Sequence, residues 1–207
     1  MTNLTDAPVL RIEQRSSQLE YLISDGTGAE LGRAVQVAGP APRKGLLGLA
    51  GSGLGDARVV LQVSGTDGAP LFYVDRKGGC PVAIVGSGGD VIGRFVGDVA
   101  GTSRAKVDSS RFGLPGAGLV HRLWDARDRP VGEVAWKVKT AQAATALEVL
   151  GGVCVDMDGT RTAEIEVQER KFKDRYTLRI PPGLPGPPEP LRTLVRAVPL
   201  ALDLTRS

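Results

Sequence analysis

Five times along the chain, a run of residues that favour β-strands meets a short turn rich in Asp and Gly, and a second such run follows. The turns are Asp25–Gly28, Gly65–Gly68, Gly86–Asp90, Asp125–Asp128 and Asp156–Gly159. Asp-Gly and similar turns favour tight hairpins because these residues accept a positive φ. Further strands are predicted at 9–15, 145–150 and 175–180. Regular short strands separated by turns indicate a mainly β protein, either a sandwich or a barrel.

Glycines recur at matching places in three of the returning strands. Gly32, Gly93 and Gly132 each follow an apolar residue soon after the turn. A glycine inside a strand often marks a bulge or a bend. Three in equivalent positions indicate a curved sheet, and closure of that sheet removes exposed strand edges. The sequence therefore predicts a closed antiparallel barrel of about twelve strands.

The C-terminal part of the chain differs from the rest. Six prolines fall within 181–190, a segment that is neither regular sheet nor regular helix. Helical spacing follows it, and the sequence predicts a helix over 190–204 with hydrophobic residues on nearly every side. Such a helix is usually buried. We expect residues 1–207 to form one domain in which this helix fills the barrel and 181–190 leads into it.

Composition excludes several other classes of protein. Residues of the AVILMFWYC set make up 42 % of the chain, which is too many for a disordered protein. Two cysteines do not make a disulfide framework, and no signal peptide or apolar run of about 20 residues is found. These features favour the cytoplasm. The net charge of +3 and only 4 % aromatic residues argue against a nucleic-acid platform.

No motif indicates catalysis, a metal or a cofactor. The segment Gly86–Val91 lacks the sixth-position Gly or Ala of a dinucleotide loop, and a strand rather than a helix is predicted after it. The segment Asp156–Val167 lacks the Gly and Glu that an EF-hand requires at its sixth and twelfth positions. His121 is the only histidine and lies near Val120 and Leu123, which favours a structural role.

The strongest functional feature is a basic cluster in the C-terminal half. Residues 101–207 carry 17 basic and 13 acidic side chains, whereas residues 1–100 carry 9 and 10. Near an anionic membrane each basic side chain contributes about 1 kcal/mol, and a phenylalanine among them has an apolar ring to insert at the interface. The alternative interpretation is a solvated hairpin tip. The predicted lipid-binding residues are Arg170, Lys171, Phe172, Lys173 and Arg175, with Lys137 and Lys139 as additions.

Two arginines of the predicted helix leave an alternative open. Arg192 and Arg196 lie one helical turn apart on an element that is expected to be buried. They are either structural residues that pair with inward groups or part of an anion-binding site.

Several of these segments together resemble a known family. They are Leu10–Arg15 leading to Tyr21–Gly32, the repeated hydrophobic-Gly-Arg motif, and Asp174–Ile180 before the helix. The chain resembles the tubby C-terminal-like superfamily, nearest to its LURP-one-related and phospholipid-scramblase-like members. This resemblance implies a closed barrel around a C-terminal helix and a non-enzymatic role in binding phosphoinositides, in membrane attachment or in regulation. The acidic calcium segment of the scramblase-like members is missing, because Glu189 is the only acid in 181–190.

Three hypotheses for function follow. The first is a binding module for anionic phospholipid headgroups at a membrane surface. The second is a regulatory or scaffold protein that binds another protein through the 39–55 loop or the proline-rich segment. The third is an enzyme that uses a carboxylate pair, which requires a polar cavity with converging acids.

Overall fold

The structure, a computed structural model, describes residues 3–16, 19–40, 57–97, 120–139, 149–168, 174–181 and 186–206. These residues form twelve strands and one helix. The elements are β1 (Val9–Ser16), β2 (Glu20–Ser24), β3 (Glu30–Ala38), β4 (Val59–Gly65), β5 (Pro70–Arg76), β6 (Val82–Gly86), β7 (Val91–Gly97), β8 (Val120–Asp125), β9 (Pro130–Lys139), β10 (Val149–Asp156), β11 (Arg161–Gln168), β12 (Arg175–Arg179) and α2 (Leu191–Arg206).

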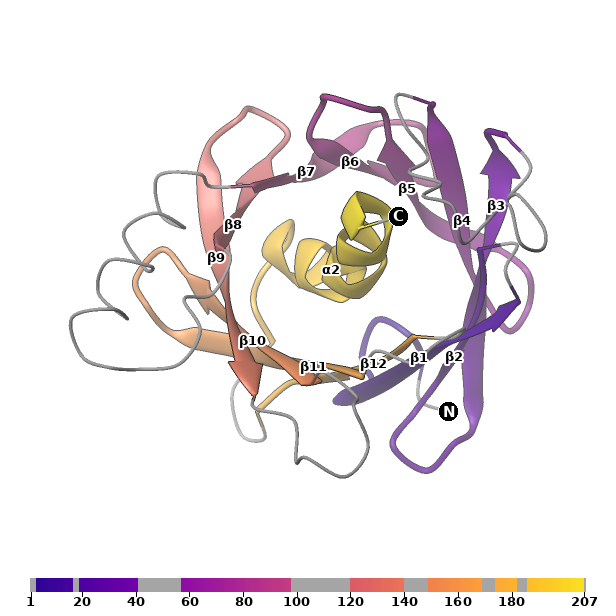
Figure 1. The fold of residues 1–207 in the computed structure, drawn as a ribbon, viewed down its shortest axis with the longest axis horizontal. Helices are drawn as coiled ribbons and strands as arrows, with labels where there is room; N and C mark the ends of the chain where they lie inside the picture. Colours follow the sequence, from indigo (N-terminus) through magenta and orange to yellow (C-terminus); the bar gives the residue numbers. More distant parts are fainter. Residues whose placement is uncertain are drawn as a thin grey trace.

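The strands form a closed antiparallel barrel. Each strand pairs with its neighbours in the sequence, and β12 closes the ring by pairing with β1. Figure 1 shows α2 inside the ring of strands. The predicted fold class, a mainly β barrel of about twelve strands that encloses a C-terminal hydrophobic helix, is therefore confirmed.

The five predicted turns share one backbone geometry. In each, the first residue donates its N–H to the carbonyl of the fifth and accepts from the N–H of the fourth, as in Asp25 to Ala29 (2.9 Å) and Gly28 to Asp25 (3.1 Å). The fourth residue always has a positive φ, and a register shift lies beside each turn. This is the three-residue hairpin loop with a bulge. The fourth residues are Gly28, Gly68, Gly89, Asp128 and Gly159.

The recurrent glycines allow a neighbouring strand to come close. A Cβ on Gly32 would lie 2.1 Å from the carbonyl oxygen of Ser64, and one on Gly93 would lie 2.1 Å from that of Trp124. A Cβ on Gly132 would lie 2.6 Å from the oxygen of Val155. Each of these oxygens belongs to the residue just before the next turn. The glycines are thus needed where one hairpin packs against the bulged start of the next.

The helix fills the middle of the barrel. Its side chains from Leu194 to Leu204 are all buried. The leucines, valines and alanines among them join one hydrophobic core with inward-facing strand residues such as Leu61, Ile84 and Leu178. Fully burying a large aliphatic side chain contributes about 1.5–3 kcal/mol. A central helix of small and aliphatic residues therefore accounts for a core that needs few aromatic rings.

One predicted boundary was wrong. The runs at 145–150 and 153–155 were expected to be separate strands, but residues 149–156 form the single strand β10, and residues 145–148 lie outside the described residues. Gly152 lies within this strand. A Cβ there would come within 2.7 Å of the Trp136 ring, so only a glycine fits beside the indole. The glycine makes room for an inward-facing indole and does not mark a turn.

The two ends of the barrel differ in their connections. The five tight turns all lie at one end, which we call the turn end. The helix begins near this end, since Leu191 approaches Gly132 of β9. The odd-numbered strands from β1 to β11 all run toward the opposite end, where the even-numbered strands begin.

Candidate functional site

The predicted lipid-binding cluster lies mostly outside the described residues. Residues 169–173, which include Arg170, Lys171, Phe172 and Lys173, are not among them. Arg175 is described at the start of β12, where its Nε lies 2.8 Å from Oε1 of Glu13. The charge of Arg175 is therefore partly offset by a neighbouring strand.

The end of the barrel opposite the turns is where the odd-numbered strands from β1 to β11 finish. Each lysine either follows an odd-numbered strand or lies among its last residues. Lys77, which follows β5, is exposed. We call this end the lysine end. The seven lysines are Lys44, Lys77, Lys106, Lys137, Lys139, Lys171 and Lys173.

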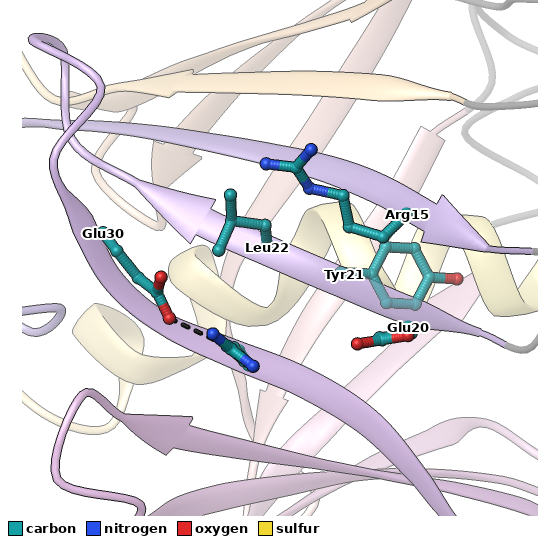
Figure 2. Close-up of a pocket in the computed structure, with 6 residues that line it drawn as sticks. Arg15, Glu20, Tyr21, Leu22 and Glu30 are labelled. Atoms are coloured by element: carbon teal, nitrogen blue, oxygen red, sulfur yellow. Dashed lines mark hydrogen bonds and ion pairs between the residues drawn. The ribbon is translucent and has the colours of Figure 1, made fainter.

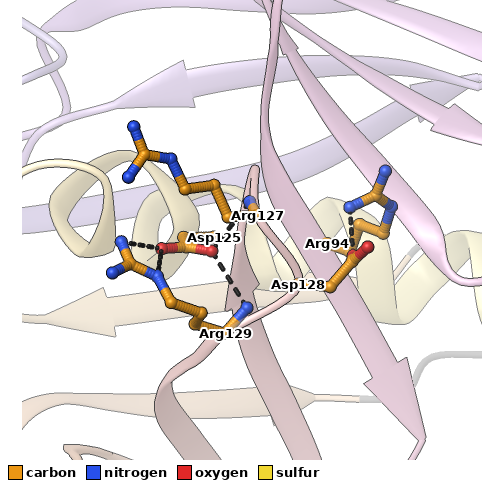
Figure 3. Close-up of polar contacts among 5 residues, drawn as sticks. All are labelled: Arg94, Asp125, Arg127, Asp128 and Arg129. Atoms are coloured by element: carbon orange, nitrogen blue, oxygen red, sulfur yellow. Dashed lines mark hydrogen bonds and ion pairs between the residues drawn. The ribbon is translucent and has the colours of Figure 1, made fainter.

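The turn end carries acids instead. Its five turns hold seven aspartates and two arginines. In the turn drawn in Figure 3, a carboxylate oxygen of Asp125 accepts the backbone N–H groups of Arg127 (2.8 Å) and Arg129 (3.0 Å). The Arg129 side chain contacts the other oxygen, and Arg94 pairs with Asp128. The backbone N–H of Arg129 is the main cause of the lowered pKa of Asp125. These acids thus stabilise the turns themselves.

A hollow lies on the outer wall of the barrel, over β1, β2 and β3. Its volume is about 240 Å³. Figure 2 shows the charged side chains around it, with Leu22 between them. Arg15 lies at a register shift in β1, between the pairs Gln14–Tyr21 and Ser16–Glu20. The residues that line it are Arg15, Glu20, Tyr21, Leu22, Glu30 and Arg33.

The four charges of the hollow balance one another. Arg33 Nε donates to Oε1 of Glu30 at 2.8 Å, and this bond is the main reason why the pKa of Glu30 is lowered. Arg15 contributes a further attraction to Glu30, and Glu20 does the same for Arg33. Among the described residues neither Arg15 nor Glu20 has an ion-pair partner of its own. The hollow therefore offers one cation and one anion to a ligand.

A polar cluster closes the interior where α2 ends. The hydroxyls of Tyr21 and Tyr176 both donate to the carboxylate of Asp203, and Tyr176 also contacts Asp174 (3.4 Å). Burial raises the pKa of Asp203, and it is also the largest cause of the raised pKa values of both tyrosines. The cluster ties the last turn of the helix to β2 and β12.

The single histidine is a core residue. His121 is 9 % exposed, its Nδ1 accepts the N–H of Trp136 at 3.0 Å, and its ring stacks on Phe95 with centroids 4.3 Å apart. Burial lowers the pKa of His121 to about 4, so the ring is neutral at pH 7. Within the described ranges no three His, Cys, Asp or Glu side chains converge on a point that suits a metal ion.

The helix arginines bind backbone carbonyls. Arg196 is 5 % exposed, and its Nε donates to the carbonyl of Leu4 (3.2 Å) while Nη1 donates to that of Arg192 (3.3 Å). Arg192 Nε donates to the carbonyl of Pro187 at 3.2 Å. These bonds fasten the N-terminal segment and the proline lead-in to the helix. They favour the structural alternative over an anion site.

The second hypothesis rests on segments that are only partly described. Of the 39–55 loop only residues 39 and 40 are described, and in the proline-rich segment residues 182–185 lie outside the described ranges. The carbonyls of Pro188 and Pro190 accept the N–H groups of Arg192 and Leu194. This part of the segment therefore caps the start of the helix.

The hollow was not predicted from the sequence. Strand alternation places Glu20 and Leu22 on the outer face, and Arg33 opposite Leu22, but nothing in the sequence marks the bulge that aims Arg15. The sequence did contain a signal for the buried cluster, since an acid within a hydrophobic helix requires partners.

Comparisons with known proteins add no relative: no family model, no curated protein and no solved structure matches the chain. Among the described residues, no helix has both the length and the apolar character that a membrane crossing requires.

Proposed function

We propose that this protein is a non-enzymatic binding module that attaches to membranes rich in anionic phospholipid headgroups, with its lysine end toward the membrane. The observation that carries the proposal is in the sequence: each of the seven lysines follows an odd-numbered strand or lies among its last residues, and these strands finish at the lysine end. At the other end, aspartates outnumber arginines and are engaged by the turns.

The charge distribution supports this orientation. A membrane with a negative surface potential attracts basic side chains with about 1 kcal/mol each, within a Debye length of about 10 Å at 0.1 M salt. Lysines in the segments that follow the odd-numbered strands therefore contribute together to one attraction, although the net charge of the whole chain is only +3. The dipolar arrangement also turns the acidic end away from the membrane.

A place among the tubby-like proteins, near the LURP-one-related members, belongs to the same proposal. The motifs that resemble this superfamily fall on β1 to β3 and on β12. The closed barrel around a C-terminal helix supports the assignment. The charges, and not the fold, support the proposed activity, because a shared fold does not establish a shared activity.

Co-sedimentation with vesicles tests the proposal. The wild type is expected to bind phosphatidylcholine vesicles that contain phosphatidylglycerol, and to be released in 1 M salt, where the Debye length is about 3 Å. The double variant Lys171→Glu/Lys173→Glu is expected to bind at least about thirtyfold more weakly, since two attractions of about 1 kcal/mol are lost and replaced by repulsion.

A matched control carries the same change of charge at the turn end. Arg127 is exposed, and among the described residues Arg161 takes part only in an exposed ion pair with Glu164. Arg127→Glu/Arg161→Glu should therefore retain most of the binding. Equal losses of binding in the two double variants would refute the proposed orientation. No salt-sensitive binding by the wild type would refute the proposed function.

A further inference from the structure

We propose that the hollow over β1, β2 and β3 binds a phosphoethanolamine group, with Arg15 as the phosphate ligand and Glu20 as the ammonium ligand. The inference rests on the proposed function, because it names a headgroup for a protein that we place at a membrane. The ligand chemistry is a phosphate ester and a primary ammonium joined by two carbons.

The cation of the hollow is available to an anion. Arg15 is exposed, and among the described residues it has no ion-pair partner. It lies at the β1 register shift, and such a bulge turns a side chain away from the regular alternation of its strand. A guanidinium suits a phosphate because its N–H groups match two phosphate oxygens at once.

The anion of the hollow is available to an amine. Glu20 begins β2 directly opposite Ser16, next to the bulge that carries Arg15. The other acid, Glu30, is already held by Arg33 at 2.8 Å, so it serves to balance that arginine. Glu20 thus remains as the carboxylate that accepts N–H bonds from a ligand.

The floor of the hollow selects a small headgroup with a primary amine. Leu22 also lines the hollow and is half-buried, so it offers an apolar surface to an ethylene linker. Choline, which has no N–H to donate, is recognised by exposed aromatic faces. Tyr21 lines the hollow but is 0 % exposed, so it presents no such face. A carboxylate with an apolar floor therefore favours ethanolamine over choline.

The position of the hollow agrees with the proposed orientation. Arg15 is near the end of β1 and Glu20 is the first residue of β2, so both lie at the lysine end of the wall. A headgroup in a membrane that faces the lysine end reaches these two residues first.

Vesicle binding and calorimetry test the inference. Adding phosphatidylethanolamine to vesicles of phosphatidylcholine and phosphatidylglycerol is expected to tighten wild-type binding about tenfold, the effect of one or two charge-assisted hydrogen bonds. Glu20→Gln and Arg15→Gln should each abolish this gain. On vesicles without phosphatidylethanolamine, Glu20→Gln should bind at least as tightly as the wild type, whereas Arg15→Gln should bind about fivefold more weakly, because it removes one basic side chain worth about 1 kcal/mol at the lysine end. The control Glu164→Gln, an exposed acid on β11, should keep the gain.

Free O-phosphoethanolamine, titrated in a calorimeter, separates the headgroup from the membrane. Binding of the free compound that is lost in Glu20→Gln supports the hollow as the site. This holds even if the wild type does not bind anionic vesicles, because that result would refute only the proposed function. A phosphatidylethanolamine gain that survives in both hollow variants, or the absence of any gain together with no binding of the free compound, overturns the inference.

Discussion

Replacing Gly93 by alanine tests the way in which the barrel closes around its helix. Gly93 faces inward on β7, where an added Cβ would lie 2.1 Å from the Trp124 carbonyl oxygen and 2.9 Å from Cδ2 of Leu194. Neighbouring carbon and oxygen atoms normally lie at least about 3.3 Å apart. The substitution therefore forces β8 and α2 to move away from β7, by about 1 Å at the carbonyl.

The cost follows from the atoms that must move. Overpacking a core costs about 1–3 kcal/mol when flexible side chains can yield. Here the closest atom belongs to the backbone of a paired strand, so we expect Gly93→Ala to lose at least about 3 kcal/mol of unfolding free energy. For a chain of this size that corresponds to a fall in Tm of roughly 6–12 °C.

Gly97 in the same strand provides the matched control. A Cβ there meets nothing within 4 Å. Gly97→Ala is expected to be neutral or to stabilise the protein by up to about 1 kcal/mol, because alanine restricts the unfolded chain. Urea unfolding followed by the fluorescence of the two tryptophans measures both variants. A Gly93→Ala variant within 1 kcal/mol of the wild type would refute the argument.

Three further predictions concern the turns, the buried acid and the histidine. Gly159→Ala should lose about 1 kcal/mol in the same unfolding assay, since only its φ of +83° opposes a side chain, and a neutral result would mean that the turn relaxes. Tyr176→Phe should lose about 1–3 kcal/mol by removing a donor to buried Asp203; a loss below 0.5 kcal/mol would contradict the importance of that bond. The pKa of His121 should be about 4 in an NMR titration. Because the unfolded side chain has a pKa near 6.5, His121 contributes about 3 kcal/mol of stability above pH 6.5, and this contribution is lost as the pH falls toward 4. A midpoint near 6.5 would show that the ring is solvated.

Much of the fold could be predicted because its determinants are local. A turn whose fourth residue must take a positive φ needs Gly, or an Asp such as Asp128, and this requirement can be read within five residues. The burial of α2 could be predicted because apolar residues surround the helix on nearly every side. The prediction failed at 145–150 and 153–155 because Gly152 is needed to make room for the Trp136 ring on another strand, not to form a turn.

The site could be predicted only in part. The basic cluster at 170–175 is a run in the sequence, so composition and charge are enough to find it. The hollow depends on a bulge at Arg15 and on three strands side by side, neither of which local propensity determines. That every lysine follows an odd-numbered strand, or lies among its last residues, likewise becomes apparent only when the strands and their directions are known.

By itself, then, the sequence determined the turns, the strands between them and a helix that has to be buried, because backbone dihedral limits and hydrophobicity act over a few residues. Only the tertiary structure decided that β12 meets β1 and that Tyr21 donates to Asp203, 182 positions away. It also decided that Arg33 pairs with Glu30 and that Arg192 and Arg196 donate to backbone carbonyls. Such contacts depend on which distant groups closure brings together, because a buried charge has to be hydrogen-bonded or paired with the groups that lie near it.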